Sequence, residues 1–298
     1  MIQPPYLQAG SKVLVCGSAR FTEPHLLNGL ETLCKTYAWE LEIDATVFDA
    51  HHQFAGDDEQ RAAAVQRALE REDVAAILFA RGGYGTIRIM EALDLSILEQ
   101  HPKWLMGFSD LTYLLNPCAQ ISPCLHGPMA LQIGDDTASD KLAAEFLSGT
   151  KKGWKTSNCR SQTNGDLANC FWVGGNLSIV YAMLALPSFH IPENAVLFLE
   201  DLDEYLYHMD RMMASLYYSG KLGKFKAVMA GSFSDMNDHT IPFGMNASEI
   251  LQHWCSKAQV ELVEELPFGH TKTNYPIVLG SPSKIAWTHQ GSFEVEWK

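Results

Sequence analysis

The fold is decided by one short stretch, Val74-Ala75-Ala76-Ile77-Leu78-Phe79-Ala80, which runs directly into Arg81-Gly82-Gly83-Tyr84-Gly85. A near-continuous apolar run of this length predicts a strand that is covered on both faces, as in a parallel sheet. The glycines that follow predict a tight turn with positive φ, or a backbone that another group approaches closely. The turn matches neither G-x-G-x-x-G nor the P-loop, so we expect no nucleotide cofactor.

Strand-like and helix-like segments alternate on both sides of this stretch. The alternation favours an α/β fold built on a doubly wound parallel sheet, in which ligands bind at the carboxyl ends of the strands. Further strands are predicted at Val13–Cys16, Trp39–Ile43 and Trp104–Phe108, and helices after Thr22 and at Asp57–Arg71, Ile87–Leu93 and Asp110–Cys118.

A polar, irregular segment over residues 151–167 divides the chain. We interpret it as the linker between a domain over residues 1–150 and a second domain over residues 168–298. The end of the second half alternates like an antiparallel hairpin around Gln290-Gly291. Its other predicted elements are helices at Asn176–Leu186 and Leu206–Tyr218 and strands at Ala195–Leu199, Val228–Ser232 and Ile277–Leu279.

Composition excludes several classes of function. Of the 298 residues 47% are apolar, which is enough for a substantial core, and 35 acidic against 22 basic side chains give a net charge of −13. Nucleic acid and anionic membranes bind basic surfaces, so neither is expected as a partner. The first residues carry no secretory signal pattern and the seven cysteines form no C-x-x-C pair, which predicts a cytoplasmic protein with reduced thiols and no zinc site.

Ser109 follows the predicted strand Trp104–Phe108 in the sequence Gly107-Phe108-Ser109-Asp110-Leu111. A serine at a sharp strand-to-helix turn exposes its hydroxyl beside backbone N–H groups that can bind an oxyanion. Leu111 stands where the hydrolase pattern G-x-S-x-G has its second glycine. Local sequence therefore leaves two interpretations open: a nucleophile, or a cap of the helix that follows.

Acidic residues crowd the stretch Glu200-Asp201-Leu202-Asp203-Glu204. The spacing lacks the pattern of a calcium loop, and some of these carboxylates suit a helix N-terminus instead, so we predict no metal. Glu200, directly after an apolar strand, is the carboxylate most suited to burial against a histidine. Among the eleven histidines His270 and His126 are the two candidates, although a structural role is the simpler interpretation of each.

Seven short motifs occur in the order found in the LD-carboxypeptidases, the muramoyltetrapeptide carboxypeptidases, which are serine peptidases. The chain resembles this family from about Val13 to its last strands. No single motif is specific, but the order of all seven is. They are RGGYG at 81–85, GFSDLT at 107–112, GPM at 127–129, GGNL at 174–177, LED-x-x-E at 199–204, DR at 210–211 and GH at 269–270.

The resemblance implies a flavodoxin-like N-terminal domain, a smaller β-rich C-terminal domain and an active site between them. It implies a catalytic triad of Ser109 as nucleophile, His270 as base and Glu200 as the carboxylate that orients the histidine; His126 lies outside these motifs. It also implies hydrolysis of the bond between an L-centre and D-alanine in murein tetrapeptides, without a cofactor, by a cytoplasmic homodimer that acts in peptidoglycan recycling.

Within this family resemblance, further residues are assigned by their position. The backbone N–H groups of Asp110 and Gly83 are our candidates for the oxyanion hole, with Gly82 as the alternative to Gly83. Arg81 is predicted to bind substrate, because an acidic protein needs a local cation for a substrate that carries carboxylates. Asn176, in the GGNL motif, is the second residue predicted to bind substrate. Arg88 is a further candidate, with a surface salt bridge as its alternative.

Two other functions remain as alternatives. Microcin C resistance hydrolases of the same family cut an amide next to a nucleotide-like group. Trp154 could stack on such a base, although packing or an interface is the more common role of a single tryptophan in a loop. A non-enzymatic, two-lobed binding module is the third hypothesis, but it does not explain why Ser109, Glu200 and His270 occur together.

Overall fold

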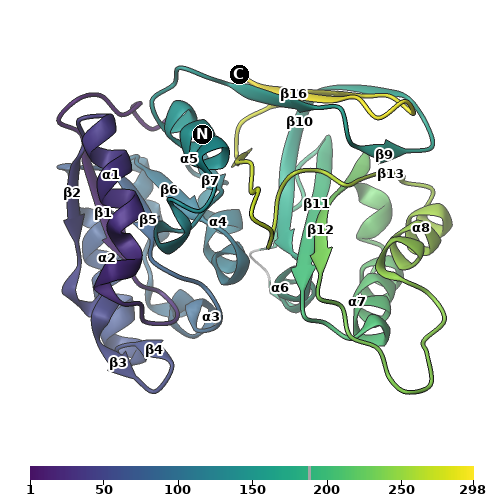
Figure 1. Ribbon diagram of the computed structural model, residues 1–298, viewed down its shortest axis with the longest axis horizontal. Coiled ribbons are helices and arrows are strands. Elements are labelled where there is room, and N and C mark those ends of the chain that lie inside the picture. Colours follow the sequence, from purple (N-terminus) through teal and green to yellow (C-terminus); the bar gives the residue numbers. More distant parts are fainter. Residues whose placement is uncertain (187–188) are drawn as a thin grey trace. The chain divides into compact units, whose positions relative to one another are not determined.

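The computed structural model describes residues 1–186 and 189–298, and these divide into two compact units (Figure 1). The first unit consists of Met1–Lys151 and Lys272–Gly280, and the second of Lys152–Thr271 and Ser281–Lys298. Among the residues described, none of the helices combines the length and the apolar character that crossing a membrane requires.

Two details of the predicted domain division are wrong. The segment Lys272–Gly280 was assigned to the second domain but belongs to the first unit, because strand β14 (Ile277–Leu279) pairs antiparallel with β7 (Cys124–His126). Residues 151–167 are not merely a linker, since they form strands of the second unit. These are β8 (Gly153–Thr156), β9 (Arg160–Ser161) and the first residues of β10 (Gly165–Asn176).

The first unit is built on a sheet of six strands. Its remaining members are β1 (Lys12–Cys16), β2 (Glu40–Ile43), β5 (Val74–Phe79) and β6 (Trp104–Gly107). The sheet order is β14-β7-β6-β5-β1-β2, and all pairs except β14–β7 are parallel. By chain order the parallel strands run 2-1-3-4-5, the flavodoxin-like arrangement. The predicted doubly wound sheet is therefore confirmed, and each of these four predicted strands agrees within one residue at either end.

Helices connect the strands of this sheet. Asp57 and Gln60 form a capping box at the start of α2, in which each side chain accepts from the other residue's backbone N–H. The expected helix at 87–93 is only a short α-helix followed by a 3-10 turn. The helices are α1 (Asn28–Thr36), α2 (Asp58–Glu70), α3 (Thr86–Ile89), α4 (Thr112–Cys118) and α5 (Thr137–Leu147), and β3 (Ala50–His51) pairs with β4 (Phe54–Ala55) outside the sheet.

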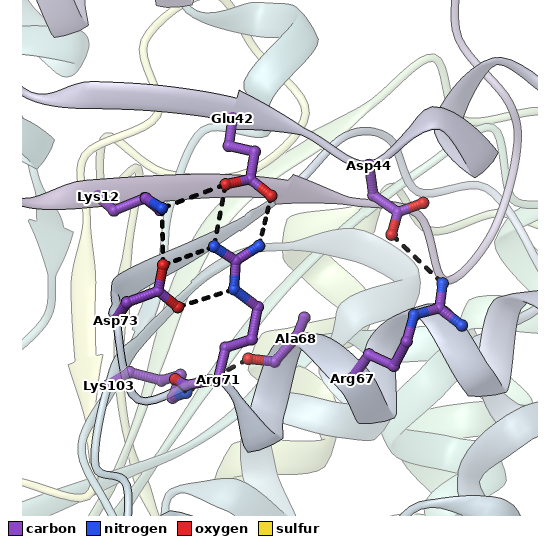
Figure 2. Close-up of polar contacts among 8 residues, drawn as sticks. All are labelled: Lys12, Glu42, Asp44, Arg67, Ala68, Arg71, Asp73 and Lys103. Carbon is purple, nitrogen blue, oxygen red and sulfur yellow. Dashed lines mark hydrogen bonds and ion pairs between the residues drawn. The ribbon is translucent and has the colours of Figure 1, made fainter.

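The end of α2 is fixed by charged side chains, which Figure 2 shows. The guanidinium of Arg71 donates to the carboxylates of Glu42 and Asp73, and Lys12 lies between the same two acids. Lys103, only 1% exposed, donates to the carbonyls of Ala68 and Arg71, so its ammonium satisfies acceptors at the helix end. Burial lowers the pKa of Lys103 to about 8.

We expect Arg71→Met to lower the free energy of unfolding by about 1 kcal/mol at pH 7, since it removes both ion pairs of a partly exposed network. Hydrogen bonds from Arg71 lower the pKa of Glu42 and of Asp73. Lowered carboxyl pKa values stabilise the fold above their unfolded values near 4, and this stabilisation is lost as the pH falls below them. The difference between variant and parent, measured by urea unfolding, should therefore shrink below about pH 4.

Lys35→Met is the matched control, because Lys35 makes only an exposed pair with Glu31 at 3.9 Å. Its effect should stay within about 0.5 kcal/mol at every pH. A cost of Arg71→Met that does not change with pH would show that the ion pairs do not contribute.

The second unit is built on a sheet of eight strands. Its remaining members are β11 (Ala195–Leu202), β12 (Ala227–Ser234), β13 (Glu261–Glu264), β15 (Ser283–Trp287) and β16 (Phe293–Trp297). The order is β8-β16-β15-β10-β11-β12-β13-β9, in which β10 to β13 are parallel and the other pairs antiparallel. The unit is thus β-rich with a parallel centre, and the predicted terminal hairpin is confirmed as β15 and β16.

Three helices accompany this sheet: α6 (Leu177–Met183), α7 (Leu206–Tyr218) and α8 (Ala247–Ala258). The bounds of α7 agree with the prediction. The spacing of its apolar residues predicts a buried stripe of five side chains, of which Tyr217 is only half-buried and the others are buried: Met209, Met212, Met213 and Leu216. In Figure 1 the arrowheads of β11 and β12 mark the carboxyl ends of two of the parallel strands. In the sequence Asp203 follows β11 and Asp235 follows β12.

Candidate active site

Ser109 lies directly after Phe108 at the end of β6, and it starts a short 3-10 helix that leads into α4. Its φ is +59°, a left-handed conformation that costs a residue with a Cβ roughly 1 kcal/mol or more. Phe108 and Leu111 on either side are buried and hold the turn in place. The strained turn and the half-buried serine match the way hydrolases present a nucleophile.

The glycine turn after β5 lies against this serine. A Cβ placed on Gly82 would be 3.3 Å from Cβ and 3.4 Å from Oγ of Ser109, and 2.6 Å from Cε of Met129. Glycine therefore lets the turn after β5 lie against Ser109, whereas a Cβ at this position would crowd the serine and displace the end of Met129. This explains why the glycine-rich turn and the serine occur together in the sequence.

Asp110 connects the same two turns. Its carboxylate is 1% exposed, and Oδ2 accepts from the backbone N–H of Thr86 at 2.8 Å, where α3 begins. Burial raises the pKa of Asp110, while hydrogen bonds from Thr86 act in the opposite direction. Its own N–H lies in the first helical turn, where N–H groups have no intrahelical acceptor. The assignment of Asp110 and Gly83 to an oxyanion hole stays a prediction.

Glu200 and His270 form a direct pair in the second unit. Nδ1 of His270 lies 2.5 Å from Oε2 of Glu200, whose side chain is fully buried. The prediction that strand β11 ends at Leu199, before Glu200, is wrong, because the strand continues to Leu202. The register between β11 and β12 shifts between Leu199 and Asp201, where β12 advances three residues against two in β11. Glu200 therefore lies opposite an irregularity of β12, a feature that is common next to active sites.

Gly269 makes the approach of His270 possible. Its φ is +111°, and a Cβ there would lie 2.5 Å from Oγ of Ser232 and 2.8 Å from Cβ of Glu200. A larger residue would push the loop away from β11 and lengthen the contact between His270 and Glu200. The G-H motif therefore has a local physical reason.

Charge and burial set the protonation behaviour of this pair. Burial lowers the pKa of His270, but the hydrogen bond that His270 makes to Glu200 and the charges of Glu200 and Asp201 outweigh burial, and the pKa is raised. The pKa of Asp201 is raised to about 7, first by burial and then by the charge of Glu200. A histidine whose protonated form is stabilised by a buried carboxylate is suited to accept a proton during a reaction.

Asn176 is 4% exposed and begins α6. Its Oδ1 accepts from the N–H of Ile179 at 3.3 Å, and its Nδ2 donates to Asp201 at 2.7 Å. These contacts give it a structural role beside Glu200, and a contact with substrate stays a prediction. Arg81 donates from Nη1 to the carbonyl of Phe21 at 3.4 Å.

Three other candidates have structural roles. Arg88 forms a salt bridge with Asp58 at 2.6 Å, the alternative considered for it. His126, 1% exposed, lies in β7 with its ring 5.8 Å from that of Phe108. Trp154 lies in β8, is 5% exposed and packs 5.2 Å from Phe293, so its suggested role in stacking on a nucleobase is wrong.

The predicted triad is divided between the two units. Ser109, Asp110, Gly83 and Arg81 lie in the first, whereas Glu200, His270 and Asn176 lie in the second. Within the described ranges no group of three or more His, Cys, Asp or Glu side chains is arranged to hold a metal ion.

Arg20 is a polar residue near the serine that sequence analysis missed. A Cβ on Gly83 would lie 2.7 Å from Cδ and from Nε of Arg20, so this side chain lies across the glycine turn. The available signal was its position: Arg20 follows β1, at the same carboxyl edge of the sheet as Ser109.

Comparison with known proteins identifies a family whose two domains correspond to the two halves of this chain. Residues 13–127 match the model of the LD-carboxypeptidase N-terminal domain, and residues 171–285 match that of the C-terminal domain. A relative from Streptomyces coelicolor that is named as a carboxypeptidase is 31% identical over 96% of this chain and 93% of its own length.

Two solved structures resemble the fold closely. The crystal structure of muramoyltetrapeptide carboxypeptidase from Oxalobacter formigenes has a TM-score of 0.83 and 26% identity, and the match covers 95% of this chain and 98% of that one. The protein MccF, solved in complex with glutamyl sulfamoyl guanosine, has a TM-score of 0.85 at 16% identity, over 98% of this chain and 97% of its own. This second likeness concerns the fold alone.

The family matches set aside the hypothesis of a non-enzymatic binding module. They cover both units, and the first includes Ser109 while the second includes Glu200 and His270. The chain belongs to the LD-carboxypeptidase family and is a serine-type carboxypeptidase, a hydrolase.

Proposed function

We propose that this protein removes the terminal D-alanine of murein tetrapeptides by hydrolysing its bond to an L-centre, through a triad of Ser109, His270 and Glu200. The observation that carries the proposal is the buried pair in which Oε2 of Glu200 lies 2.5 Å from Nδ1 of His270. A carboxylate in this position fixes the tautomer of the imidazole and leaves Nε2 as the atom that accepts a proton. The strained turn at Ser109 supplies a nucleophile of the expected kind.

The reaction proceeds in two halves. Nε2 of His270 accepts the hydroxyl proton as Oγ of Ser109 attacks the scissile carbonyl carbon, and backbone N–H groups of Asp110 and Gly83 donate to the resulting oxyanion. The protonated His270 then donates to the leaving nitrogen, so that D-alanine departs and an acyl-enzyme remains. Water, deprotonated by His270, hydrolyses this ester and restores the serine.

We expect purified protein to release free D-alanine from L-Ala-γ-D-Glu-meso-Dap-D-Ala without added metal or nucleotide, measured by chromatography of both products. A pentapeptide ending in D-Ala-D-Ala serves as the control, because its terminal bond joins two D-centres and should stay intact. Release of D-alanine from the pentapeptide alone, or from neither peptide, would contradict the proposed substrate.

The competing substrate class is tested in the same assay. An aminoacyl sulfamoyl adenylate offers an amide next to a nucleotide-like group. Trp154 was the side chain that favoured this substrate class, but it is buried against Phe293 and so does not support it. A strong preference for that compound over the tetrapeptide would reverse our choice. The homodimer and the cytoplasmic location stay predictions.

A further inference from the structure

Four arginines lie near the carboxyl edge of the sheet in the first unit, and three of them have contacts that occupy their charge or fix their position. Arg61 is fully buried and pairs with Asp58, and Arg88 pairs with the same carboxylate at 2.6 Å. Arg81 donates to the carbonyl of Phe21. The fourth, Arg20, makes its side-chain hydrogen bond to a neutral amide, with Nε donating to Oε1 of Gln53 at 3.2 Å.

Arg20 and Arg81 are therefore the two of these four cations without a carboxylate within 4 Å among the residues described. Of the two, it is the side chain of Arg20 that lies across the glycine turn at Gly83. Asp58 neutralises both Arg61 and Arg88, although the chain as a whole carries a net charge of −13. A half-buried guanidinium that is not neutralised in this way retains its donors for an anionic ligand, and its planar fork suits a carboxylate.

The position of Arg20 relates it to the nucleophile. Its Cδ and Nε lie against Cα of Gly83, while Cβ and Oγ of Ser109 lie against Cα of Gly82. Neighbouring Cα atoms are about 3.8 Å apart, so the two side chains flank adjacent residues of one turn. Burial raises the pKa of Asp110, the residue after the nucleophile, and the charge of Arg20 is one of the interactions that oppose this rise.

A carboxypeptidase must recognise the free carboxylate at the end of its substrate. In a terminal amino acid, three covalent bonds separate the scissile carbonyl carbon from the carboxylate carbon, a span of about 4 Å or less. A cation that binds this carboxylate must therefore lie one residue away from the position where the serine attacks. The relation between Arg20 and Ser109 across Gly82-Gly83 meets this requirement.

We propose that Arg20 binds the terminal carboxylate of the substrate and so restricts this enzyme to the last residue of a peptide. The inference rests on the proposed function, since it takes Ser109 as the nucleophile. It names Arg20, rather than Arg81, as the specificity-determining cation.

The test compares two tetrapeptides that differ only at the end, one with a free terminal carboxylate and one ending in D-alaninamide. We expect the parent enzyme to prefer the acid by about 10- to 100-fold in kcat/KM, the size of one charge-assisted interaction. Arg20→Met should abolish this preference by lowering kcat/KM for the acid while the amide is hydrolysed at an unchanged rate. Arg20→Lys should recover part of the preference, because lysine keeps the charge but not the fork.

Arg67→Met is the matched control, because Arg67 is an exposed arginine of the same unit whose partner, Asp44, lies 3.5 Å away. It should keep the preference unchanged. The inference is overturned if Arg20→Met retains the preference for the acid, if it lowers both rates equally as a merely structural residue would, or if Arg81→Met abolishes the preference instead.

A second readout separates this inference from the murein substrate. Two aryl phosphonates, one carrying a carboxylate and the other its carboxamide, are compared by their rates of reaction with Ser109, followed by mass spectrometry. With the parent enzyme, we expect the carboxylate phosphonate to react faster than its carboxamide. With Arg20→Met, the two compounds should react at the same rate. If no D-alanine is released but this Arg20-dependent difference is present, the proposed substrate fails and the inference stands; if D-alanine is released without it, the inference fails alone.

Discussion

Ser109→Ala is expected to reduce D-alanine release from the murein tetrapeptide by about 10⁴-fold or more, because no other group can form the acyl-enzyme. The residual rate would come from binding and from oxyanion stabilisation by backbone N–H groups. The measurement is single-turnover release of D-alanine at saturating enzyme. His270→Ala should be about as damaging, and the double variant little worse than either, because nucleophile and base act as a unit.

Ser109→Gly separates the chemical role from the strained backbone. Both Ser109→Ala and Ser109→Gly remove the hydroxyl and should be equally inactive, but only glycine adopts a φ of +59° without steric cost. In urea unfolding, Ser109→Gly should therefore be more stable than Ser109→Ala by about 1 kcal/mol. Turnover by either variant within about 100-fold of the parent rate would show that Ser109 is not the nucleophile. Equal stability of the two variants would show that the turn is not strained.

Local sequence patterns are sufficient to predict those strands and helices whose buried residues recur regularly along the chain. The continuous apolar run at Val74–Phe79 predicts a strand, and the apolar stripe of Leu206–Tyr218 predicts a helix, each from neighbouring residues alone. In contrast β7 has only three residues, too few for a periodic signal, and the three-residue β14 reads as a strand but not as a member of the first unit. That membership depends on pairing with β7, a contact between residues about 150 positions apart that no local pattern encodes.

The site shows the same division. Local sequence left Ser109 open between a nucleophile and a helix cap, and the order of seven motifs, not their chemistry, decided between them. The positive φ at Ser109 and the irregularity of β12 opposite Glu200 depend on how strands pair and turns pack, so a single sequence does not reveal them. Arg20 was missed because its significance arises from contact with Gly83, which lies 63 residues away in the chain.

Glu200→Gln is expected to lower kcat by about 10⁴-fold with a smaller effect on KM. The amide keeps the shape of the side chain, but it removes the charge that stabilises protonated His270 and presents the wrong hydrogen-bonding pattern to Nδ1. Since Glu200 is fully buried next to His270, no water can replace that charge. Steady-state rates of D-alanine release measure the effect.

The same variant should change the pH dependence in a direction that the geometry fixes. The hydrogen bond and charge of Glu200 raise the pKa of His270, whereas burial lowers it, so removal of the charge leaves burial and a lower pKa. Activity requires neutral His270, and kcat/KM therefore falls as the pH decreases through this pKa. In Glu200→Gln that acidic limb should move to lower pH while the maximal rate collapses.

Glu204→Gln is the matched control within the same acidic stretch. Glu204 pairs with His208 at 3.2 Å rather than with His270, so its neutralisation should leave both the rate and the acidic limb close to those of the parent enzyme. If Glu204→Gln or Asp201→Asn destroyed activity while Glu200→Gln kept near-full kcat, the triad carboxylate would be misplaced within Glu200–Glu204. A Glu200→Gln enzyme that lost activity without any shift of the acidic limb would contradict the role of Glu200 in setting the charge of His270.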